Sequence, residues 1–401
     1  MPGNHTADGP RLPLGDIRVL EMTEALAGPY CGMMLGDLGA DVIKIERPGI
    51  GDQARQWGPP FLEGESAYFL SVNRNKRSIT LDAKNESDLR KLHHLVRRSD
   101  VFITNVPRID SLRRARIDPD TLRALNPRLI YAAISGYGHT GPKAGRGGYD
   151  IIAQGESGLM ALTGGAGDGP TRFPTPMSDI TAGIYTVIGI LSALLTRAQS
   201  GLGQFIDVSL VDAQTTWLAN IGGSYFATGR RPKKIGNLHP TITPYQPVRT
   251  KDKTILIAVG TEPLWQRFCM LLGIEHTLMR DPRFMTNPQR NEHREQLIPL
   301  LEAILETRTA AEWLAEFVAH EIPAGPINFP DETLTDEHLK ARGMIVELKH
   351  PLAGLVRSIG NPIHLSETPP TYRRHPPRLG EHNAEIAAWL AADPAHSHEG
   401  A

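Results

Sequence analysis

Residues 17–46 read IRVLEMTEALAGPYCGMMLGDLGADVIKIE, and the order of elements in this stretch sets the fold class. The β-branched runs IRVLEM (17–22) and DVIKIE (41–46) are typical of buried strands. Between them, PYCGMMLGDLG (29–39) spaces its apolar residues three and four apart, which favours a helix. A strand, a helix and a second strand in this order predict a parallel βαβ unit.

The same alternation continues to about residue 226. DVFITN (100–105) and LIYAAIS (129–135) are predicted strands, and ESDLRKLHHLVRRS (86–99) is a predicted helix. GQFIDVSLVDAQTTWLANIGGSYF (203–226) gives one more strand followed by a helix. The first half of the chain therefore predicts an α/β fold with a parallel sheet covered by helices.

A second unit is expected after this alternation stops. ATGRRPKKIGNLHPTITPY (227–245) brings together basic, Gly and Pro residues that break the pattern. TILIAVG (254–260) then reads as a strand, and helical patterns continue to about residue 320. Near the C-terminus, MIVELKHPLAGLVRSIGNPIHL (344–365) predicts a hairpin.

Composition excludes several kinds of partner. The 401 residues carry 43 Lys and Arg against 44 Asp and Glu, so no bulk charge favours nucleic acid or an acidic membrane. The two cysteines, Cys31 and Cys269, form no C-x-x-C motif and no cluster with histidine. This pattern suits a reducing compartment and argues against a structural zinc site or any other metal site.

Two features bear on location. MPGNHTADGPRLPLGD (1–16) lacks the basic and apolar regions of a secretory signal, which predicts a cytoplasmic protein. The apolar stretch around 180–196 is shorter than the ~20 residues that cross a bilayer, so it predicts a buried core helix.

Common catalytic motifs are missing from the sequence. The first strand–helix junction reads TEALAGPYCGMM (23–34), in which Gly28 and Gly32 do not have the G-x-G-x-x-G spacing of nicotinamide-binding folds. There is no G-x-S-x-G elbow and no P-loop lysine. Dehydrogenase, serine hydrolase and kinase chemistry are therefore disfavoured.

A carboxylate stands at the start of a very apolar helix, because PTPMSDITAG (174–183) precedes IYTVIGILSALLTR (184–197). The local explanation is helix capping by Ser178 or Asp179. NRNKRSI (73–79) and PRIDSLRRAR (107–116) are basic runs that form either solvated faces or a site for a phosphate-rich ligand. GGYDIIAQGESG (147–158) places Tyr149 and Asp150 beside a turn, where a loop acid is the local explanation.

Taken together, these stretches resemble the class III CoA-transferases, also called the CaiB/BaiF type. The likeness covers nearly the whole chain and is densest over 15–225. The stretches that carry it are VLEMTEALAGPY (19–30), LGDLGADVIKIERPGIGD (35–52), NRNKRSITLD (73–82), LNPRLIYAAISGYG (125–138), GYDIIAQGESGLMALTG (148–164), PMSDITAG (176–183) and TRAQSGLGQFIDVSL (196–210).

The resemblance implies that Asp179 is a nucleophile. It attacks an acyl-CoA donor to give a mixed anhydride, then forms an aspartyl-CoA thioester, and an acceptor acid finally takes the CoA. The helix N-terminus is expected to keep Asp179 ionised at neutral pH. CoA esters are then substrates, and neither a metal nor a permanently bound cofactor is expected.

The resemblance also implies roles for other positions. Asp150 matches an acid beside the nucleophile and Tyr149 precedes it. Gly260, in AVGTEPLW (258–265), is what remains of a mobile glycine-rich loop, and Trp57 matches a residue that lies against that loop. Leu26 stands where formyl-CoA transferases have Gln, which disfavours the oxalate/formyl pair. The positions that match contacts to the CoA nucleotide are Arg47, Lys76, Arg77, Asn105 and Arg113.

Three functions are compatible with this resemblance. Related racemases of α-methylacyl-CoA need a His where this chain has Tyr149, which favours transfer unless His239 reaches the site. Transfer from succinyl-CoA to a dicarboxylate such as glutarate, malate, citramalate or itaconate is the leading hypothesis. A catalytically silent CoA-binding protein is the third. The candidates for holding the distal carboxylate are Arg55, Arg146, Arg172 and His239.

The resemblance further implies an architecture and an assembly. A large Rossmann-like α/β domain is built from residues 1–222 and 331–401, and a smaller α+β domain with its linkers occupies 223–330. Family members form interlocked homodimers of two open rings, so the expected partners are a second copy of the chain, an acyl-CoA donor and a carboxylic-acid acceptor. Neither nucleic acid nor a membrane is an expected partner.

Overall fold

The computed structural model describes residues 12–392. Most of the stretch MPGNHTADGPRLPLGD (1–16), on which the predicted cytoplasmic location rests, lies outside the described residues. Contacts divide the chain into two compact units. Unit 1 takes the described residues up to Met160, Arg172–Gly222 and the chain from Glu337 onward. Unit 2 takes Ala161–Thr171 and Gly223–Asp336.

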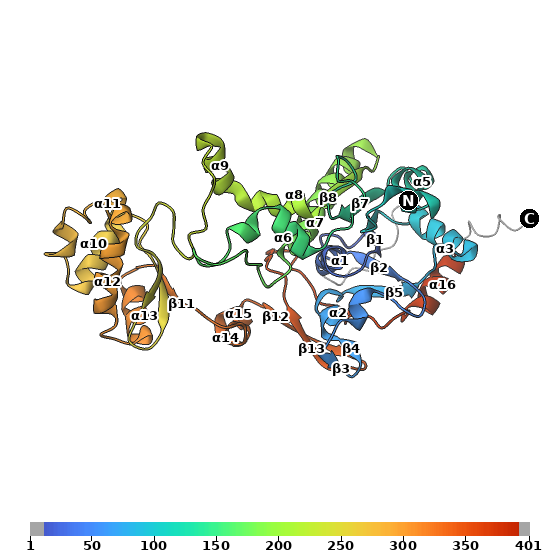
Figure 1. Cartoon of the computed structure of the whole chain (residues 1–401). Coiled ribbons are helices and arrows are strands. Elements are labelled where there is room, and N and C mark those ends of the chain that lie inside the picture. Colours follow the sequence, from blue (N-terminus) through green and yellow to red (C-terminus); the bar gives the residue numbers. More distant parts are fainter. Residues whose placement is uncertain (1–11, 393–401) are drawn as a thin grey trace, which may run out of the picture. The chain divides into compact units, whose positions relative to one another are not determined.

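Unit 1 is built on a six-stranded sheet in the order β5-β2-β1-β6-β7-β8 (Figure 1). Every neighbouring pair is parallel, which confirms the predicted parallel α/β sheet. The strands are β1 (Arg18–Met22), β2 (Asp41–Glu46), β5 (Lys76–Thr80), β6 (Val101–Thr104), β7 (Ile130–Ser135) and β8 (Phe205–Ser209).

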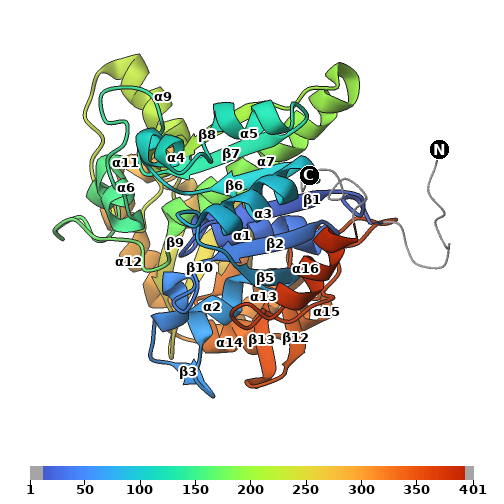
Figure 2. The same cartoon turned by 90° about the vertical axis from the view of Figure 1, so that its right-hand side faces the viewer.

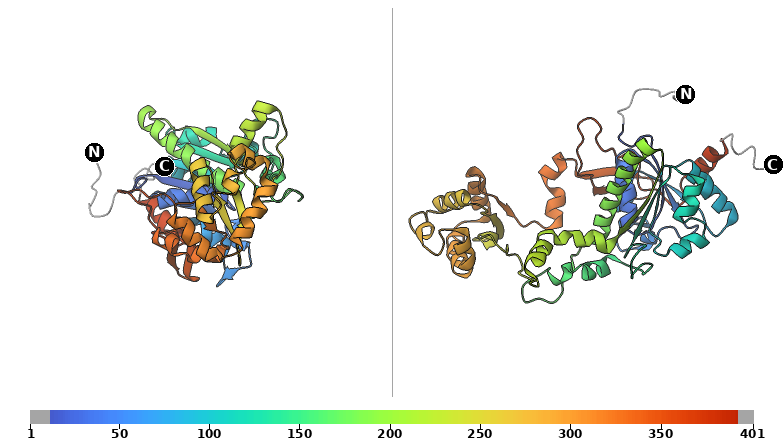
Figure 3. Two further views of the ribbon diagram at one scale, coloured as in Figure 1. Left: turned by 90° about the vertical axis from the view of Figure 1, so that its left-hand side faces the viewer. Right: turned by 90° about the horizontal axis from the view of Figure 1, so that it is seen from above.

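Both faces of this sheet are covered by helices, because successive strand residues point to opposite faces. Val19 belongs to a core with α1 (Ala27–Asp37) and α7 (Met177–Ser200). Leu20, the next residue, belongs to a second core with α3 (Glu86–Arg97). Figure 3 shows the green α7 and the cyan α3 on opposite sides of the sheet.

The sequence does not predict the edge strand β5, because NRNKRSI reads either as a solvated basic face or as a site for a phosphate-rich ligand. Its register places Lys76 opposite Val42 and Ile79 opposite Ile45 of β2. The C-terminal helix α16 (Asn383–Ala391) packs beside β5, as Figure 2 shows. The end of the chain thus completes the sheet's covering layer.

Helix α7 is longer than the predicted apolar stretch. It spans 24 residues, and its length and mean hydropathy of 1.6 would allow a membrane crossing, although a soluble core helix passes the same test. Ala182, Val187 and Ile190 are buried against α1 and the sheet, whereas Ile188 and Leu195 are exposed. The predicted core helix is therefore buried on one face only.

The remaining elements of unit 1 surround this sheet. The predicted C-terminal hairpin is present, since β12 (Ile345–His350) pairs antiparallel with β13 (Gly354–Ile359). A second hairpin joins β3 (Phe61–Leu62) and β4 (Glu65–Ser66). The other helices are α2 (Ala67–Val72), α4 (Ile109–Arg114), α5 (Pro119–Leu125), α6 (Asp150–Glu156), α8 (Leu210–Thr215) and α15 (Glu337–Ala341); α9 (Ala219–Thr228) spans the division between the units.

Unit 2 has its own antiparallel sheet in the order β11-β10-β9. Its core joins this sheet to the helices through large side chains such as Trp265, Phe268 and Trp313. The elements are β9 (Tyr245–Arg249), β10 (Thr254–Ala258), β11 (Ala324–Pro326), α10 (Glu262–Leu272), α11 (Asn287–Glu292), α12 (Arg294–Leu305), α13 (Ala310–Ala319) and α14 (Pro330–Thr335).

Candidate active site

Asp179 lies in the first turn of α7, and a residue from another helix caps that turn. Oδ1 of Asp150, at the start of α6, accepts a hydrogen bond from Ser178 N at 2.9 Å. Neither Ser178 nor Asp179 caps the helix with its own side chain, so that prediction is wrong. Within residues 12–392 the carboxylate of Asp179 has no hydrogen-bond partner, which leaves it available for chemistry.

The electrostatics of Asp179 differ from the prediction. Burial, and then the negative charge of Asp150, raise the pKa of Asp179 to about 7. The expectation that the helix end keeps Asp179 ionised at neutral pH is therefore wrong, because a carboxyl with a pKa of about 7 is about half protonated at pH 7. Two neighbouring carboxylates in one partly buried site are a common mark of a functional centre.

Gln154 holds the segment that leads into α7. Its Nε2 donates to Oδ2 of Asp150 at 2.7 Å and to Phe173 O at 3.2 Å, and its Oε1 accepts from Phe173 N at 2.8 Å. Gln154 is buried, so these bonds are shielded from water. One amide side chain thus fixes both the capping acid and the chain just before Asp179.

Close packing of α1 against α7 fixes the other side of the site. A Cβ at Gly183 would lie 2.8 Å from Ala27 O, so only glycine permits this approach. The loop before α1 is held by Asp52, whose Oδ1 accepts from Ala25 N at 2.9 Å. Ala25 has φ of 71°, a left-handed conformation that non-glycine residues seldom adopt. This loop places Leu26 at the start of α1, as Asp179 is placed at the start of α7.

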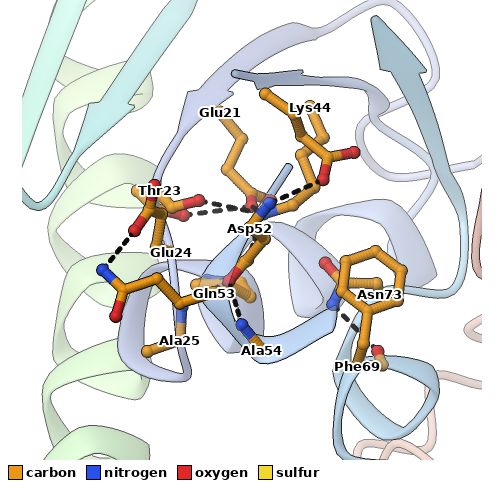
Figure 4. Close-up of polar contacts among 12 residues, drawn as sticks. Glu21, Thr23, Glu24, Ala25, Lys44, Asp52, Gln53, Ala54, Phe69 and Asn73 are labelled. Atoms are coloured by element: carbon orange, nitrogen blue, oxygen red, sulfur yellow. Dashed lines mark hydrogen bonds and ion pairs between the residues drawn. The ribbon is translucent and has the colours of Figure 1, made fainter. Parts of the chain in front are cut away.

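A buried ion cluster lies beneath that loop, at the carboxyl ends of β1 and β2. Nζ of Lys44 lies 2.9 Å from both Glu21 Oε1 and Asp52 Oδ2, as Figure 4 shows. Nζ of Lys76 lies 2.7 Å from Glu21 Oε2 and donates to Asn73 Oδ1 at 2.8 Å. These groups are fully or almost fully buried, so the cluster is a structural support of the loop.

The structure corrects the prediction that Lys76 and Arg77 hold the CoA nucleotide. Lys76 has no exposed surface, and burial lowers its pKa to about 8. Arg77 is almost buried and pairs with Asp41 at 2.6 Å and with Glu385 at 2.7 Å. Both cations have partners inside the fold, because β5 is a strand of the sheet and not a surface run.

Two other predicted nucleotide contacts are brought together. Arg47 pairs with Glu24 Oε1 at 2.9 Å, and Asn105 donates from Nδ2 to Glu24 O at 2.8 Å. Arg47 remains half-exposed, so it can receive an anion at the carboxyl edge of the sheet. Arg113 is exposed on α4, with Asp110 3.5 Å away.

Aromatic side chains flank the opening beside Leu26. The rings of Trp57 and Tyr68 meet edge to face with centroids 5.0 Å apart. Burial, and then the charges of Asp179 and Asp150, raise the pKa of Tyr68 to about 12. Leu26 and Tyr68 both line a cavity of about 300 Å³ in unit 1. Tyr149, by contrast, is 68% exposed.

The cations predicted to hold a distal carboxylate are scattered. Arg55 is committed to Glu46 through two bonds of 2.7 Å and lies over the ring of Phe69. Arg172 is exposed and donates to Pro174 O at 2.8 Å, and Arg146 is also exposed. None of the three lines the cavity.

Gly260 and His239 belong to unit 2. Gly260 directly precedes Thr261, the N-cap of α10, and a Cβ at this glycine would meet no atom within 4 Å. His239 packs its ring 5.1 Å from that of Tyr245. Among the described residues no group of three or more His, Cys, Asp or Glu could hold a metal ion.

Sequence reasoning missed Gln154, Asp52 and Tyr68. Each acts through a contact with a residue distant in sequence, and no local spacing signals such contacts. Asp52 and Gln154 do lie inside stretches that carry the resemblance, LGDLGADVIKIERPGIGD (35–52) and GYDIIAQGESGLMALTG (148–164), whereas Tyr68 lies in none of them.

Comparison with known sequences places these features in context. Residues 14–383 match the profile of the family described as CoA-transferase family III. A succinate–glutarate CoA-transferase of Agrobacterium fabrum is 41% identical over 384 residues, which cover 94% of this chain and 96% of the relative. A succinyl-CoA:glutarate CoA-transferase of Mus musculus is 37% identical over 375 residues, which cover 93% of this chain and 85% of the relative.

A solved structure shows the same fold. A CaiB/BaiF family protein from Brucella suis superposes with a TM-score of 0.85 at 42% sequence identity. The match covers 94% of this chain and 99% of the Brucella chain.

Proposed function

Because the chain belongs to CoA-transferase family III and is a CoA-transferase, we propose that it moves CoA from succinyl-CoA to a free dicarboxylic acid of four or five carbons. Asp179 is the nucleophile in this proposal. The observation that carries it is a carboxylate in the first turn of α7, largely buried and with no hydrogen-bond partner in the described chain. The names of the two relatives, each of which includes a succinyl or succinate partner and glutarate, support the choice of donor and acceptor class.

The reaction begins with the donor half. The Asp179 carboxylate oxygen attacks the thioester carbonyl of succinyl-CoA, the carbon–sulfur bond breaks, and the CoA thiolate leaves. The thiolate then attacks the Asp179 carbonyl of the resulting anhydride. Succinate departs as a carboxylate, and an aspartyl-CoA thioester remains.

The acceptor half repeats these steps in reverse order. The acceptor carboxylate attacks the aspartyl thioester and displaces the CoA thiolate, which gives a new anhydride. The thiolate attacks the acceptor carbonyl of that anhydride, so the acceptor leaves as its CoA ester and Asp179 regains its carboxylate. Each step exchanges one acyl bond for another, so no net proton or electron is consumed.

The neighbours of Asp179 have supporting roles. Asp150 orients the first turn of α7 through Ser178 N and raises the pKa of Asp179, which makes its ionised form a stronger base. Arg47, Asn105 and Arg113 are proposed contacts of the CoA nucleotide, because the first two converge on Glu24 at the sheet edge and the third is exposed. Lys76 and Arg77 are left out of this proposal.

Transfer is favoured over racemisation of α-methylacyl-CoA. Racemisation needs a second proton-transfer group beside the acid, and Tyr149 offers a phenol where an imidazole would be required. We also propose an interlocked homodimer in the cytoplasm. Exposed apolar residues on α7 and α9, such as Leu195 and Phe226, support a second copy as partner.

A panel of acceptors tests the proposed function. The protein is mixed with succinyl-CoA and, separately, with malate, citramalate, itaconate, mesaconate, glutarate or oxalate, and the CoA esters are followed by chromatography and mass. A new ester with equimolar loss of succinyl-CoA is expected for at least one acid of four or five carbons. No new ester from any of them would contradict the proposal, and epimerisation of a chiral methylacyl-CoA would then favour the racemase.

A further inference from the structure

The cavity of about 300 Å³ lies beside the nucleophile and is built within unit 1 alone. Ile180, which follows Asp179, lines it together with Pro176. Leu26, Met33 and Val72 form a buried cluster against which Tyr30, Tyr68 and Ile180 pack. The cavity wall is therefore largely apolar, and Ile180, the residue after the reacting Asp179, forms part of it.

An ion pair forms part of the wall away from α7. Arg74 and Asp37 line the cavity, and they are its only charged lining residues within the described chain. Nε and NH2 of Arg74 donate to the two carboxylate oxygens of Asp37 at 2.9 and 2.7 Å. NH1 donates to Ser358 Oγ at 2.9 Å and to Ile359 O at 2.8 Å. A guanidinium has five N–H groups, so one N–H on NH2 is left over.

Tyr30 supplies a second donor to the same cavity. Its hydroxyl has no hydrogen-bond partner within residues 12–392, although its ring packs against α7 at Gly183. Tyr30 and Asp37 lie two turns apart on the face of α1 that lines the cavity. Tyr30 and the Arg74–Asp37 ion pair therefore border the same cavity. Burial raises the pKa of Tyr30, so its hydroxyl keeps its proton.

The volume fits an acid with a carbon chain and a second polar end. A cavity of about 150 Å³ can hold a benzene molecule, so about 300 Å³ leaves room for a five-carbon chain with two carboxylates. An apolar wall favours the methylene groups. A far carboxylate needs donors, and the wall supplies the Tyr30 hydroxyl and the remaining Arg74 N–H.

We propose that this cavity holds the acyl chain and that Tyr30, with Arg74, receives the far carboxylate of the dicarboxylic acid. This inference rests on the proposed function and names the residue that separates dicarboxylic from monocarboxylic substrates. A site built to hydrogen-bond a carboxylate rejects an analogue that lacks it, because its buried donors are then left unpaired.

The test measures binding and not turnover. In an Asp179→Asn protein, which cannot form the anhydride, calorimetry compares glutaryl-CoA with pentanoyl-CoA, an ester of equal chain length without the second carboxylate. Glutaryl-CoA is expected to bind at least about tenfold more tightly, as for a hydrogen bond to a charged group. Adding Tyr30→Phe should reduce that preference about tenfold while the affinity for free CoA is unchanged.

Tyr137→Phe is the matched control, because its hydroxyl donates to Glu156 at 2.8 Å outside the cavity. Tyr30→Phe keeps the ring that packs on α7, and a thermal melt verifies folding. An unchanged preference after Tyr30→Phe, or no preference before it, overturns the inference. Wild-type transfer is measured separately with the panel of acceptors. Transfer to a dicarboxylic acid of four or five carbons with an unchanged preference overturns this inference alone, whereas a Tyr30-dependent preference without transfer to any acceptor overturns the proposed function alone.

Discussion

Asp150 caps the helix that carries Asp179: its Oδ1 accepts from Ser178 N at 2.9 Å. The same side chain therefore positions the nucleophile's helix and, through its charge, makes ionisation of Asp179 more difficult. Burial is the larger of the two causes of the raised pKa. The cap and the charge can be separated, because an amide keeps one acceptor oxygen for Ser178 N and removes the charge, at the cost of the bond from Gln154 Nε2 to Oδ2.

Asp150→Asn is predicted to shift the pH dependence of transfer. Only ionised Asp179 attacks, so wild-type kcat should rise with pH around a midpoint of about 7. Without the neighbouring charge the pKa of Asp179 falls, and the midpoint should move to lower pH while the cap to Ser178 is kept. The measurement is kcat against pH for both proteins. A midpoint that stays in place would show that Asp150 acts only as a cap.

Asp179→Asn is predicted to stabilise the protein at alkaline pH. The folded-state pKa of about 7 lies above the ordinary value of 3.8, so the folded protein holds this proton more tightly than the unfolded chain. The contribution of Asp179 to stability is therefore greatest at low pH and is lost as pH rises from about 4 to about 7. Thermal melts at pH 8 should show a higher Tm for the variant, and the difference should shrink at pH 5. An equal or lower Tm at pH 8 would contradict the raised pKa.

Gln154→Leu is predicted to lower both stability and turnover. The change leaves Phe173 N and O without their buried partner and frees Oδ2 of Asp150, which should cost about 1–3 kcal/mol of unfolding free energy. Transfer should slow because the segment before Asp179 loses its anchor. Urea unfolding and kcat are measured together, with the exposed Gln199→Leu as control. A Gln154 variant that behaves like the control would refute the anchoring role.

The interlocked homodimer predicts the absence of a folded monomer. Two threaded rings cannot separate without unfolding, so dilution should leave the mass of the particle at twice that of the 44.0 kDa chain. Light scattering over a range of concentrations measures this mass. A monomer that appears on dilution and keeps its native circular dichroism would rule out threading.

The central sheet could be predicted because its strands are short runs rich in β-branched and other apolar residues, as in β1, β2, β6 and β7. The edge strand β5 could not, because Lys76 and Arg77 read as surface cations when their partners Glu21 and Asp41 are unknown. From the local sequence a charged side chain is expected to face solvent. Only the folded structure shows that these two cations are buried with anionic partners.

The sequence could identify the acidic residues of the candidate site, but it could not show how they are arranged in space. The resemblance pointed to Asp179 and Asp150 from sequence. The cap joins Asp150 to Ser178, 28 residues further along the chain, and the cavity brings together α1, α2, the start of α7 and the end of β13. Neither the raised pKa of Asp179 nor the position of Tyr30 follows from local spacing, since both depend on that assembly.

Covalent attachment of CoA to Asp179 is the most direct test of the account. The protein is incubated with succinyl-CoA without an acceptor, quenched in acid and digested, and the peptide containing Asp179 is analysed by mass spectrometry. We predict that this peptide gains the mass of CoA less water, with the addition on Asp179, and that Asp179→Asn shows none. An unmodified peptide from a protein that still transfers CoA, or an addition on another residue, would contradict Asp179 as the nucleophile.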